Sequence, residues 1–271
     1  MIARALTVAG SDSGGGAGIQ ADLKTFQELG VFGTTAITAI TVQNSRGVHG
    51  IVPLSPAVIA EQIAAVLGDI GADAVKTGML HSAAVMETVA LELQRFGCRR
   101  VVVDPVIVAK DESRLMEKDA LQAAREVLMP LAYVVTPNLP EAAALLGIEE
   151  TAIRSRSDME EAAGEILKLG PQFVLLKGGH AGHLDDPSFA ADVLVGRSGA
   201  PLWLVSERID TQHTHGTGCT LSAAIAACLA LGYPVEEAAR HAKRFVSAAI
   251  AEAIPLGSGI GSLRHAAHRS R

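Results

Sequence analysis

The sequence predicts an α/β protein, a three-layer α/β/α sandwich with a mostly parallel central sheet and a small edge flap. Short runs rich in Val, Ile and Thr alternate with longer stretches of helical spacing, which is the pattern of βαβ units covered on both faces. The chain has 271 residues, 49% hydrophobic and 3% aromatic, so its core must be aliphatic. No stretch reads as a linker and no repeat is evident. We therefore expect one domain over residues 1–271.

The first half of the chain supplies four predicted strands and the flap. An apolar strand at 5–9 ends at Gly10, and a glycine-rich loop then leads into a helix at 19–29. β-Branched residues predict a strand at 34–42. Further on we expect an edge strand or flap at 48–54, a helix at 56–70, a strand at 74–77, a helix at 82–96 and a strand at 101–106.

The second half repeats the alternation and adds an outer hairpin. We expect a helix at 117–128, a strand at 133–136, helices at 140–146 and 158–169, a strand at 173–177, hairpin strands at 193–196 and 201–205, a glycine-initiated helix and a helix at 235–254. Ligands of such sheets lie beyond the carboxyl ends of the strands. The polar residues at those ends are Ser11, Asp12, Gln43, Asp104, Asn138 and Lys177.

Charge and cysteine usage exclude several classes of protein. The net charge is −6 without a long basic run, so we expect no nucleic-acid partner. Cys98, Cys219 and Cys228 form no CxxC pair, which disfavours a disulfide framework or a structural zinc site. The apolar runs are too short for a signal peptide or a membrane span. We expect a cytoplasmic homodimer that acts on small molecules.

The stretch DTQHTHGTGCTLSAAIAACLALG, residues 210–232, is the strongest candidate for a functional site. Gly216, Thr217 and Gly218 precede an unbroken helix, so backbone N–H groups and the helix N-terminus can together bind an anion such as phosphate. A glycine-rich turn that merely starts a core helix fits the spacing equally well. A helix N-terminus lowers a thiol pKa, so Cys219 is the candidate general base, with simple packing as the alternative.

Two common nucleotide motifs do not apply. A GxGxxA match exists at Gly16, Gly18 and Ala21, but no Asp or Glu lies between Glu28 and Glu61, where a dinucleotide fold needs one. The Gly-Lys-Ser/Thr triplet of a Walker loop is absent from the sequence. If this chain binds ATP, residues 216–219 are the best candidates to hold its phosphates.

Three further segments suit phosphoryl transfer. Asn138 and Glu141, one helical turn apart in TPNLPE, could hold a hydrated Mg²⁺ or simply cap the helix. Lys177 ends an apolar strand, where it could bind a phosphate or reach to the surface. Asp104 in VVVDPV could lie behind the metal or a water, or form an Asp-Pro turn.

The motif HTHGTGCT resembles the anion-hole signature of the ribokinase-like superfamily. With Cys in place of the usual Asp, it is similar to the hydroxymethylpyrimidine/phosphomethylpyrimidine kinases of thiamine biosynthesis. AGSDSGGGAGIQADLKTF, AITVQNSRGV, KTGML, TPNLPEAAALL and LLKGGH resemble the same family, so the resemblance extends from residue 9 to residue 222. One departure is His213, where the family often has Asn.

The resemblance implies a ribokinase-like fold and a kinase that depends on ATP and Mg²⁺. Its substrates would be 4-amino-5-hydroxymethyl-2-methylpyrimidine and the monophosphate of that compound. The family's Asn-x-x-Glu motif assigns Asn138 and Glu141 to the ATP and metal site. Two alternatives stay open: a kinase for pyridoxine-type vitamers, which share a ring hydroxymethyl group, and a non-catalytic vitamin- or nucleotide-binding module.

The resemblance also implies the residues that hold the pyrimidine beside Cys219. They are Gly10, Asp22, Gln43, Met79 and Val106. An amide such as Gln43 suits the donor and acceptors of an aminopyrimidine, and Met79 offers a soft apolar wall. Asp22 is expected to accept a hydrogen bond from the substrate. His180 and His183 are interpreted as loop residues.

Overall fold

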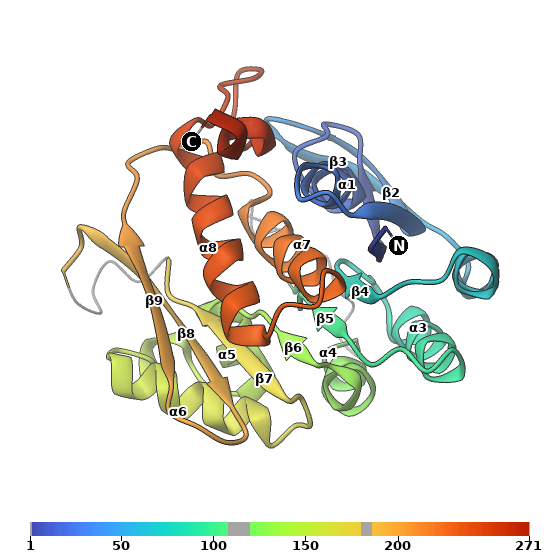
Figure 1. The fold of residues 1–271 in the computed structure, drawn as a ribbon, viewed down its shortest axis with the longest axis horizontal. Helices are drawn as coiled ribbons and strands as arrows, with labels where there is room; N and C mark the ends of the chain where they lie inside the picture. The colour runs from blue at the N-terminus through green and yellow to red at the C-terminus, as the bar shows by residue number, and fades with distance from the viewer. Residues whose placement is uncertain (1, 108–119, 180–185, 271) are drawn as a thin grey trace.

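One mixed sheet organises the chain, of which the computed structural model describes residues 2–107, 120–179 and 186–270. Within these residues the sheet has nine strands in the order β3-β2-β1-β4-β5-β6-β7-β8-β9 (Figure 1). They are β1 (Arg4–Asp12), β2 (Phe32–Asn44), β3 (Gly47–Pro53), β4 (Ala74–Thr77), β5 (Val101–Val103), β6 (Val134–Val135), β7 (Phe173–Lys177), β8 (Phe189–Gly196) and β9 (Leu202–Glu207). The six neighbouring strands β2, β1, β4, β5, β6 and β7 pair in parallel. At the edges of the sheet, β3 pairs antiparallel with β2, and β8 pairs antiparallel with both β7 and β9.

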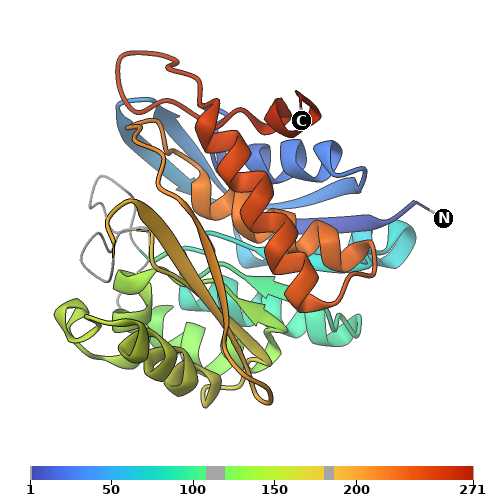
Figure 2. The ribbon, with the colours of Figure 1, turned by 60° about the vertical axis from the view of Figure 1, so that its left-hand side comes forward.

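Helices cover both faces of this sheet. One face packs against α1 (Gly18–Glu28), α7 (Thr217–Ala230) and α8 (Val235–Ala251). The other packs against α2 (Pro56–Ala65), α3 (Ala83–Arg95), α4 (Ala120–Ala123), α5 (Leu139–Leu146) and α6 (Arg156–Leu167). Short helical segments lie at η1 (Val66–Ile70), η2 (Ala124–Leu128), η3 (Met129–Leu131), η4 (Glu150–Ala152) and η5 (His265–Ser270). The predicted three-layer α/β fold is confirmed, and Figure 2 again shows α8 beside α7.

The central strands contribute side chains to both cores. In β5, Val101 and Val103 belong to one core and Val102 to the other. In β6, Val135 and Val134 divide in the same way. Because both faces are covered, these strands are continuous runs of valine and do not alternate with polar residues.

Several predicted boundaries shift for local reasons. The strand expected at 101–106 ends at Val103, because Pro105 has no N–H to continue the ladder. The helix expected at 56–70 is α-helical to Ala65 and then a π-helical turn. The start of the helix expected at 117–128 and the residues His180 and His183 lie outside the described residues.

The topology also brings distant loops to one edge of the sheet. Parallel pairing places the ends of β1, β2, β4, β5, β6 and β7 along the same edge. The strand-end residues Asp12, Gln43 and Lys177 lie there. No helix in the described part of the chain combines the length and hydropathy that crossing a membrane requires.

Candidate active site

The predicted anion hole lies at the start of α7. Gly216 is the N-cap of this helix with φ +83°, and a Cβ there would overlap the carbonyl oxygen of Gly16. Glycine is therefore required both for the backbone angle and for the close approach. The hydroxyl and the N–H of Thr217 both donate to the Thr214 carbonyl, at 2.8 and 3.3 Å, which closes the turn.

The next two N–H groups of α7 have the properties of an anion site. Within residues 2–107, 120–179 and 186–270, the N–H groups of Gly218 and Cys219 donate to no acceptor, as is usual in the first turn of a helix. They add to the positive end of the helix dipole. This pair, and not the N–H of Thr217, is the part of the predicted hole that remains available to a ligand.

Lys177 lies against this helix start. Its Nζ is 3.3 Å from Oδ1 of Asp104, and a Cβ on Gly218 would lie 3.3 Å from the same Nζ. Asp104 also accepts hydrogen bonds from the hydroxyls of Thr136, at 3.1 Å, and Ser222, at 3.2 Å. The strand-end residues Asp104 and Lys177 thus meet at the N-terminus of α7.

Asp104 and Lys177 each shift the pKa of the other residue in the direction that favours its charged form. Burial alone would raise the pKa of Asp104, but the nearby Lys177 and Lys76 hold that pKa below its usual value. Burial alone would lower the pKa of Lys177, but Asp104 and Glu141 raise it. Lys177 is therefore a charged donor, mostly but not fully buried, beside the first turn of α7.

Asn138 and Glu141 form the capping box of α5, so the capping alternative describes their geometry. Oδ1 of Asn138 accepts from the Glu141 N–H, and Oε2 of Glu141 accepts from the Asn138 N–H, both at 2.8 Å. The same Oε2 lies 3.8 Å from Nζ of Lys177. Burial raises the pKa of Glu141 to about 7, against the opposing effect of Lys177. The capping box therefore also holds the carboxyl group of Glu141 beside Lys177.

The expected depression of the Cys219 pKa is wrong in direction. Burial, together with the nearby carboxylates of Asp22 and Asp104, raises the pKa of this thiol to about 11. The ammonium group of Lys76 and a hydrogen bond from the Gly18 N–H oppose this shift without cancelling it. The thiol is thus predominantly protonated at neutral pH, despite its place in the first turn of a helix.

Sequence reasoning missed the buried cation beneath Cys219. Lys76 in β4 has no exposed surface, and its Nζ lies 2.8 Å from Oδ2 of Asp22 in α1. The Thr7 hydroxyl donates to the same Asp22 oxygen at 2.6 Å. The carboxylate expected to face substrate is therefore fully enclosed and already engaged. A lone Lys inside an otherwise apolar strand was the available signal, the same one that drew attention to Lys177.

Gly10 and Met79 lie together beside the site. The β1–β2 pairing shifts register between Ala9 and Ser11, and a Cβ on Gly10 would lie 2.5 Å from Cε of Met79. The bulge and the missing side chain make room for the methionine. Val106 is partly exposed beyond β5, where its N–H donates to the Asp104 carbonyl at 2.9 Å.

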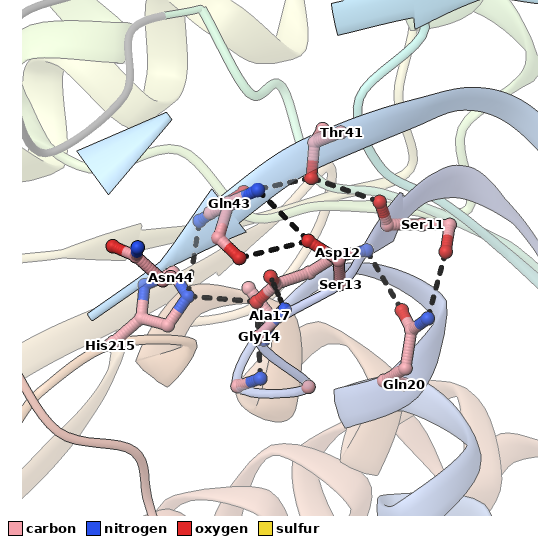
Figure 3. Close-up of polar contacts among 12 residues, drawn as sticks. Ser11, Asp12, Ser13, Gly14, Ala17, Gln20, Thr41, Gln43, Asn44 and His215 are labelled. Atoms are coloured by element: carbon pink, nitrogen blue, oxygen red, sulfur yellow. Dashed lines mark hydrogen bonds and ion pairs between the residues drawn. The ribbon is translucent and has the colours of Figure 1, made fainter. Parts of the chain in front are cut away.

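Gln43 takes part in a polar cluster that joins three distant segments (Figure 3). Its amide nitrogen lies 3.3 Å from Nε2 of His215, and its amide oxygen lies 3.1 Å from the Thr41 hydroxyl. Nε2 of His215 also lies 2.9 Å from Oδ2 of Asp12. Asp12 is expected at this edge of the sheet. The contacts of His215 with Asp12 and Gln43 are not predicted, because contacts between loops leave no periodic pattern in the sequence.

The mostly parallel sheet, the start of α7 and the position of Lys177 between Asp104 and Glu141 are consistent with a kinase of the ribokinase-like fold. A family model described as phosphomethylpyrimidine kinase matches residues 12–264. The chain belongs to this family.

Individual relatives are similar over nearly their whole length. The chain is 45% identical over 271 residues to the hydroxymethylpyrimidine/phosphomethylpyrimidine kinase of Bacillus subtilis, covering 99% of this chain and 96% of the relative. It is 46% identical over 268 residues to the pyridoxine kinase of the same organism, covering 98% and 97%. Among solved structures, an ADP complex of Bacillus subtilis pyridoxal kinase matches with a TM-score of 0.90 and 44% identity, covering 100% of both chains.

Proposed function

We propose that this protein transfers the γ-phosphoryl group of ATP to 4-amino-5-hydroxymethyl-2-methylpyrimidine and then a second one to the resulting monophosphate, in thiamine biosynthesis. The observation that carries the proposal is the position of Lys177 against the start of α7, where the N–H groups of Gly218 and Cys219 donate to no acceptor within the described residues. Family membership supplies the substrate class. On this proposal, residues 1–271 act as one kinase domain.

In the first reaction the substrate hydroxyl oxygen attacks the γ-phosphorus, and the bond to the bridging oxygen of ADP breaks. The N–H groups of Gly218 and Cys219 and the ammonium of Lys177 would receive the phosphoryl oxygens and stabilise the charge that develops. Cys219 would take the proton of the hydroxyl as general base through the small fraction of its thiol that is ionised at neutral pH, a fraction that grows as pH rises. In the second reaction the attacking phosphate oxygen is already anionic, so no base is needed.

Mg²⁺ would neutralise charge on the phosphates of ATP during the transfer. No group of three or more His, Cys, Asp or Glu suited to a metal exists among the described residues, which argues against an all-protein cage. Mg²⁺ commonly keeps several waters and binds through nucleotide phosphates and one or two carboxylates. Glu141 and Asp104 fit that arrangement, with Asn138 fixing Glu141 through the capping box.

Substrate would lie on the other side of Cys219. Gly10 and Met79 would provide the apolar wall, and Gln43 the polar contact. Val106 would border the same pocket. Because the carboxylate of Asp22 is enclosed with Lys76, we assign Asp22 to holding that cation beneath the pocket.

A vitamin B6 kinase is the second candidate, favoured by the 46% identity to pyridoxine kinase. A coupled assay of ADP release with the pyrimidine, its monophosphate and pyridoxine side by side separates the two. We expect efficient use of the pyrimidine and its monophosphate. Efficient use of pyridoxine alone would establish the second candidate, and no ADP release with any of the three would indicate a binding module.

A homodimer in the cytoplasm completes the proposal. Ile40 and Val52 are cross-strand neighbours on the outer β2–β3 edge, and with Val42 they are 48%, 58% and 57% exposed. Such an apolar edge suits contact with a second copy of the chain. Sedimentation analysis tests this, with Val42→Lys expected to favour the monomer. All three cysteines are free, in keeping with a reducing compartment.

A further inference from the structure

The carboxylate of Asp12 is an unusually well-satisfied buried acceptor. It accepts backbone N–H bonds from Gly14 at 2.7 Å, Gly16 at 3.1 Å and Ala17 at 2.8 Å, and it is 3% exposed. Burial alone would raise the pKa of Asp12, but these bonds and the His215 contact hold it below its usual value. Asp12 is therefore ionised, so the hydrogen between it and His215 belongs to Nε2 of the histidine.

That hydrogen decides the direction of the neighbouring amide. With the amide nitrogen of Gln43 3.3 Å from the same Nε2, two donors would face each other. The amide oxygen would need the hydrogen of the Thr41 hydroxyl, which already donates to the Ser11 carbonyl at 3.0 Å. Oxygen and nitrogen of a carboxamide are assigned from their partners.

Exchanging the two amide atoms removes both conflicts. The Gln43 oxygen then accepts from the Nε2–H of His215, which is shared with Asp12. The Gln43 nitrogen donates to the Thr41 hydroxyl, and that hydroxyl donates to Ser11. Every group in Figure 3 along this path then has a partner of the opposite kind.

We propose that Asp12 and His215 are positioning residues that fix the direction of the Gln43 amide and thereby favour an aminopyrimidine over a pyridoxine-type ring. The inference rests on the proposed function. An oriented amide presents one N–H and one acceptor lone pair in a set order, which matches the adjacent amino group and ring nitrogen of an aminopyrimidine. Pyridoxine has no such amino edge, so an amide free to rotate would discriminate less.

The direct test reads the histidine itself and needs no substrate. In the ¹⁵N NMR spectrum of the full-length protein near neutral pH, Nε2 of His215 should show the shift of a protonated ring nitrogen. His215→Gln assigns the signal. An unprotonated Nε2 would overturn the proposed amide direction, whatever the enzyme phosphorylates.

The kinetic test uses two replacements of His215. His215→Phe keeps a ring against Gly16 but removes the donor, whereas His215→Gln keeps an N–H near the position of Nε2. We expect His215→Phe to lower the ratio of kcat/KM for the pyrimidine over pyridoxine roughly tenfold, mainly through KM for the pyrimidine, with KM for ATP unchanged. His215→Gln should restore most of the ratio.

A double variant separates positioning from a general structural effect. If His215 acts through Gln43, then His215→Phe in a Gln43→Leu background should change the ratio no further. The matched control is His213→Asn, since His213 bonds the Gly261 N–H at 2.9 Å and lies outside the cluster. An equal loss on every substrate including ATP, or full additivity in the double variant, would refute the positioning role. A wild-type enzyme inactive on the pyrimidine would instead refute the proposed function, and the NMR result would still stand.

Discussion

Nζ of Lys76 lies 2.8 Å from one oxygen of Asp22 and 3.0 Å from the other, and neither side chain has any exposed surface. Burial alone would lower the pKa of Lys76, but the charge of Asp22 raises it above its usual value. The pair joins β4 to α1 beneath Cys219, the proposed general base. A buried pair of this kind is costly to break from one side, because the remaining charge has no partner.

Lys76→Met should therefore lower the free energy of unfolding by about 3–5 kcal/mol, since it leaves Asp22 buried and unpaired. The double variant Lys76→Met/Asp22→Leu should recover much of that loss. Urea denaturation of the two variants measures both effects. Equal instability of the single and the double variant would show that packing, not the unpaired charge, dominates.

Gln43→Leu should weaken use of the pyrimidine far more than ATP binding. Leucine would leave the polar edge of the bound ring without a hydrogen-bond partner, at a cost of roughly 1–3 kcal/mol. Steady-state kinetics with each substrate varied in turn separates the two effects. If mutant and wild type show equal kcat/KM for the pyrimidine, Gln43 is not part of the substrate site.

Glu141→Gln should raise the Mg²⁺ concentration needed for half-maximal rate and lower turnover. The glutamine oxygen can still accept from the Asn138 N–H, so the cap of α5 survives while the charge is lost. Titration of Mg²⁺ against rate measures the effect. Ser155→Ala removes the cap of α6 as a control and should cost about 1 kcal/mol of stability without altering the Mg²⁺ dependence. An unchanged Mg²⁺ requirement in Glu141→Gln would limit Glu141 to capping.

Cys219→Ala should distinguish the two phosphorylation reactions. A general base contributes roughly a hundredfold or more to attack by the alcohol, whereas the monophosphate needs none. Because the pKa of the thiol is raised to about 11, the wild-type rate on the alcohol should keep rising with pH through the neutral range. The variant should lose that rise and retain most activity on the monophosphate.

Two outcomes of the Cys219→Ala experiment would contradict the base role. Equal losses on alcohol and monophosphate would mean that Cys219 shapes the anion hole. No loss on either would mean that it is a packing residue. Both rates are measured with saturating ATP across the same pH range. The rate on the monophosphate then shows whether pH or the substitution has damaged the protein as a whole.

His265 should make the protein less stable in mild acid. Burial lowers the pKa of this side chain from 6.5 to about 4, and its Nε2 lies 3.0 Å from the Thr220 hydroxyl. The folded state therefore resists protonation that the unfolded chain accepts. The contribution is fully present above pH 6.5 and is lost as pH falls toward 4, by about 3 kcal/mol.

Urea denaturation at several pH values measures this effect. His265→Gln should flatten that part of the pH dependence of the free energy of unfolding. His49→Gln, at an exposed position, should leave it as in the wild type. If His265→Gln and wild type lose stability in parallel between pH 6.5 and 4, another group is responsible.

The order of strands and helices could be predicted because it depends on local periodicity, although the prediction overlooked Pro105 as the residue that ends β5. The convergence of Asp104 and Lys177 could also be predicted, since parallel strands bring their carboxyl ends to one edge. Both conclusions need only the hydrophobic pattern of each segment and the rule that parallel strands end at the same edge of a sheet.

Other features of the site depend on contacts between segments far apart in the chain. Asp22 could be placed on a helix, but not on the face that meets Lys76. The direction of the Cys219 pKa shift depends on how deeply α7 is buried, which outweighs the effect of the helix end. The contact of His215 with Asp12 joins the segment before α7 to the end of β1, and no periodic pattern in the sequence reveals a contact between such distant segments.

A Cβ on Gly216 would overlap the carbonyl oxygen of Gly16, so the loop before α1 and the loop before α7 fill one shared space. Gly16 and Gly216 are 200 residues apart in the sequence, yet their loops are in direct contact. A hybrid enzyme that takes only one of them from a homologue will inherit a mismatch at this contact whenever the donor loop follows a different path. Grafting both loops as a matched pair avoids that mismatch.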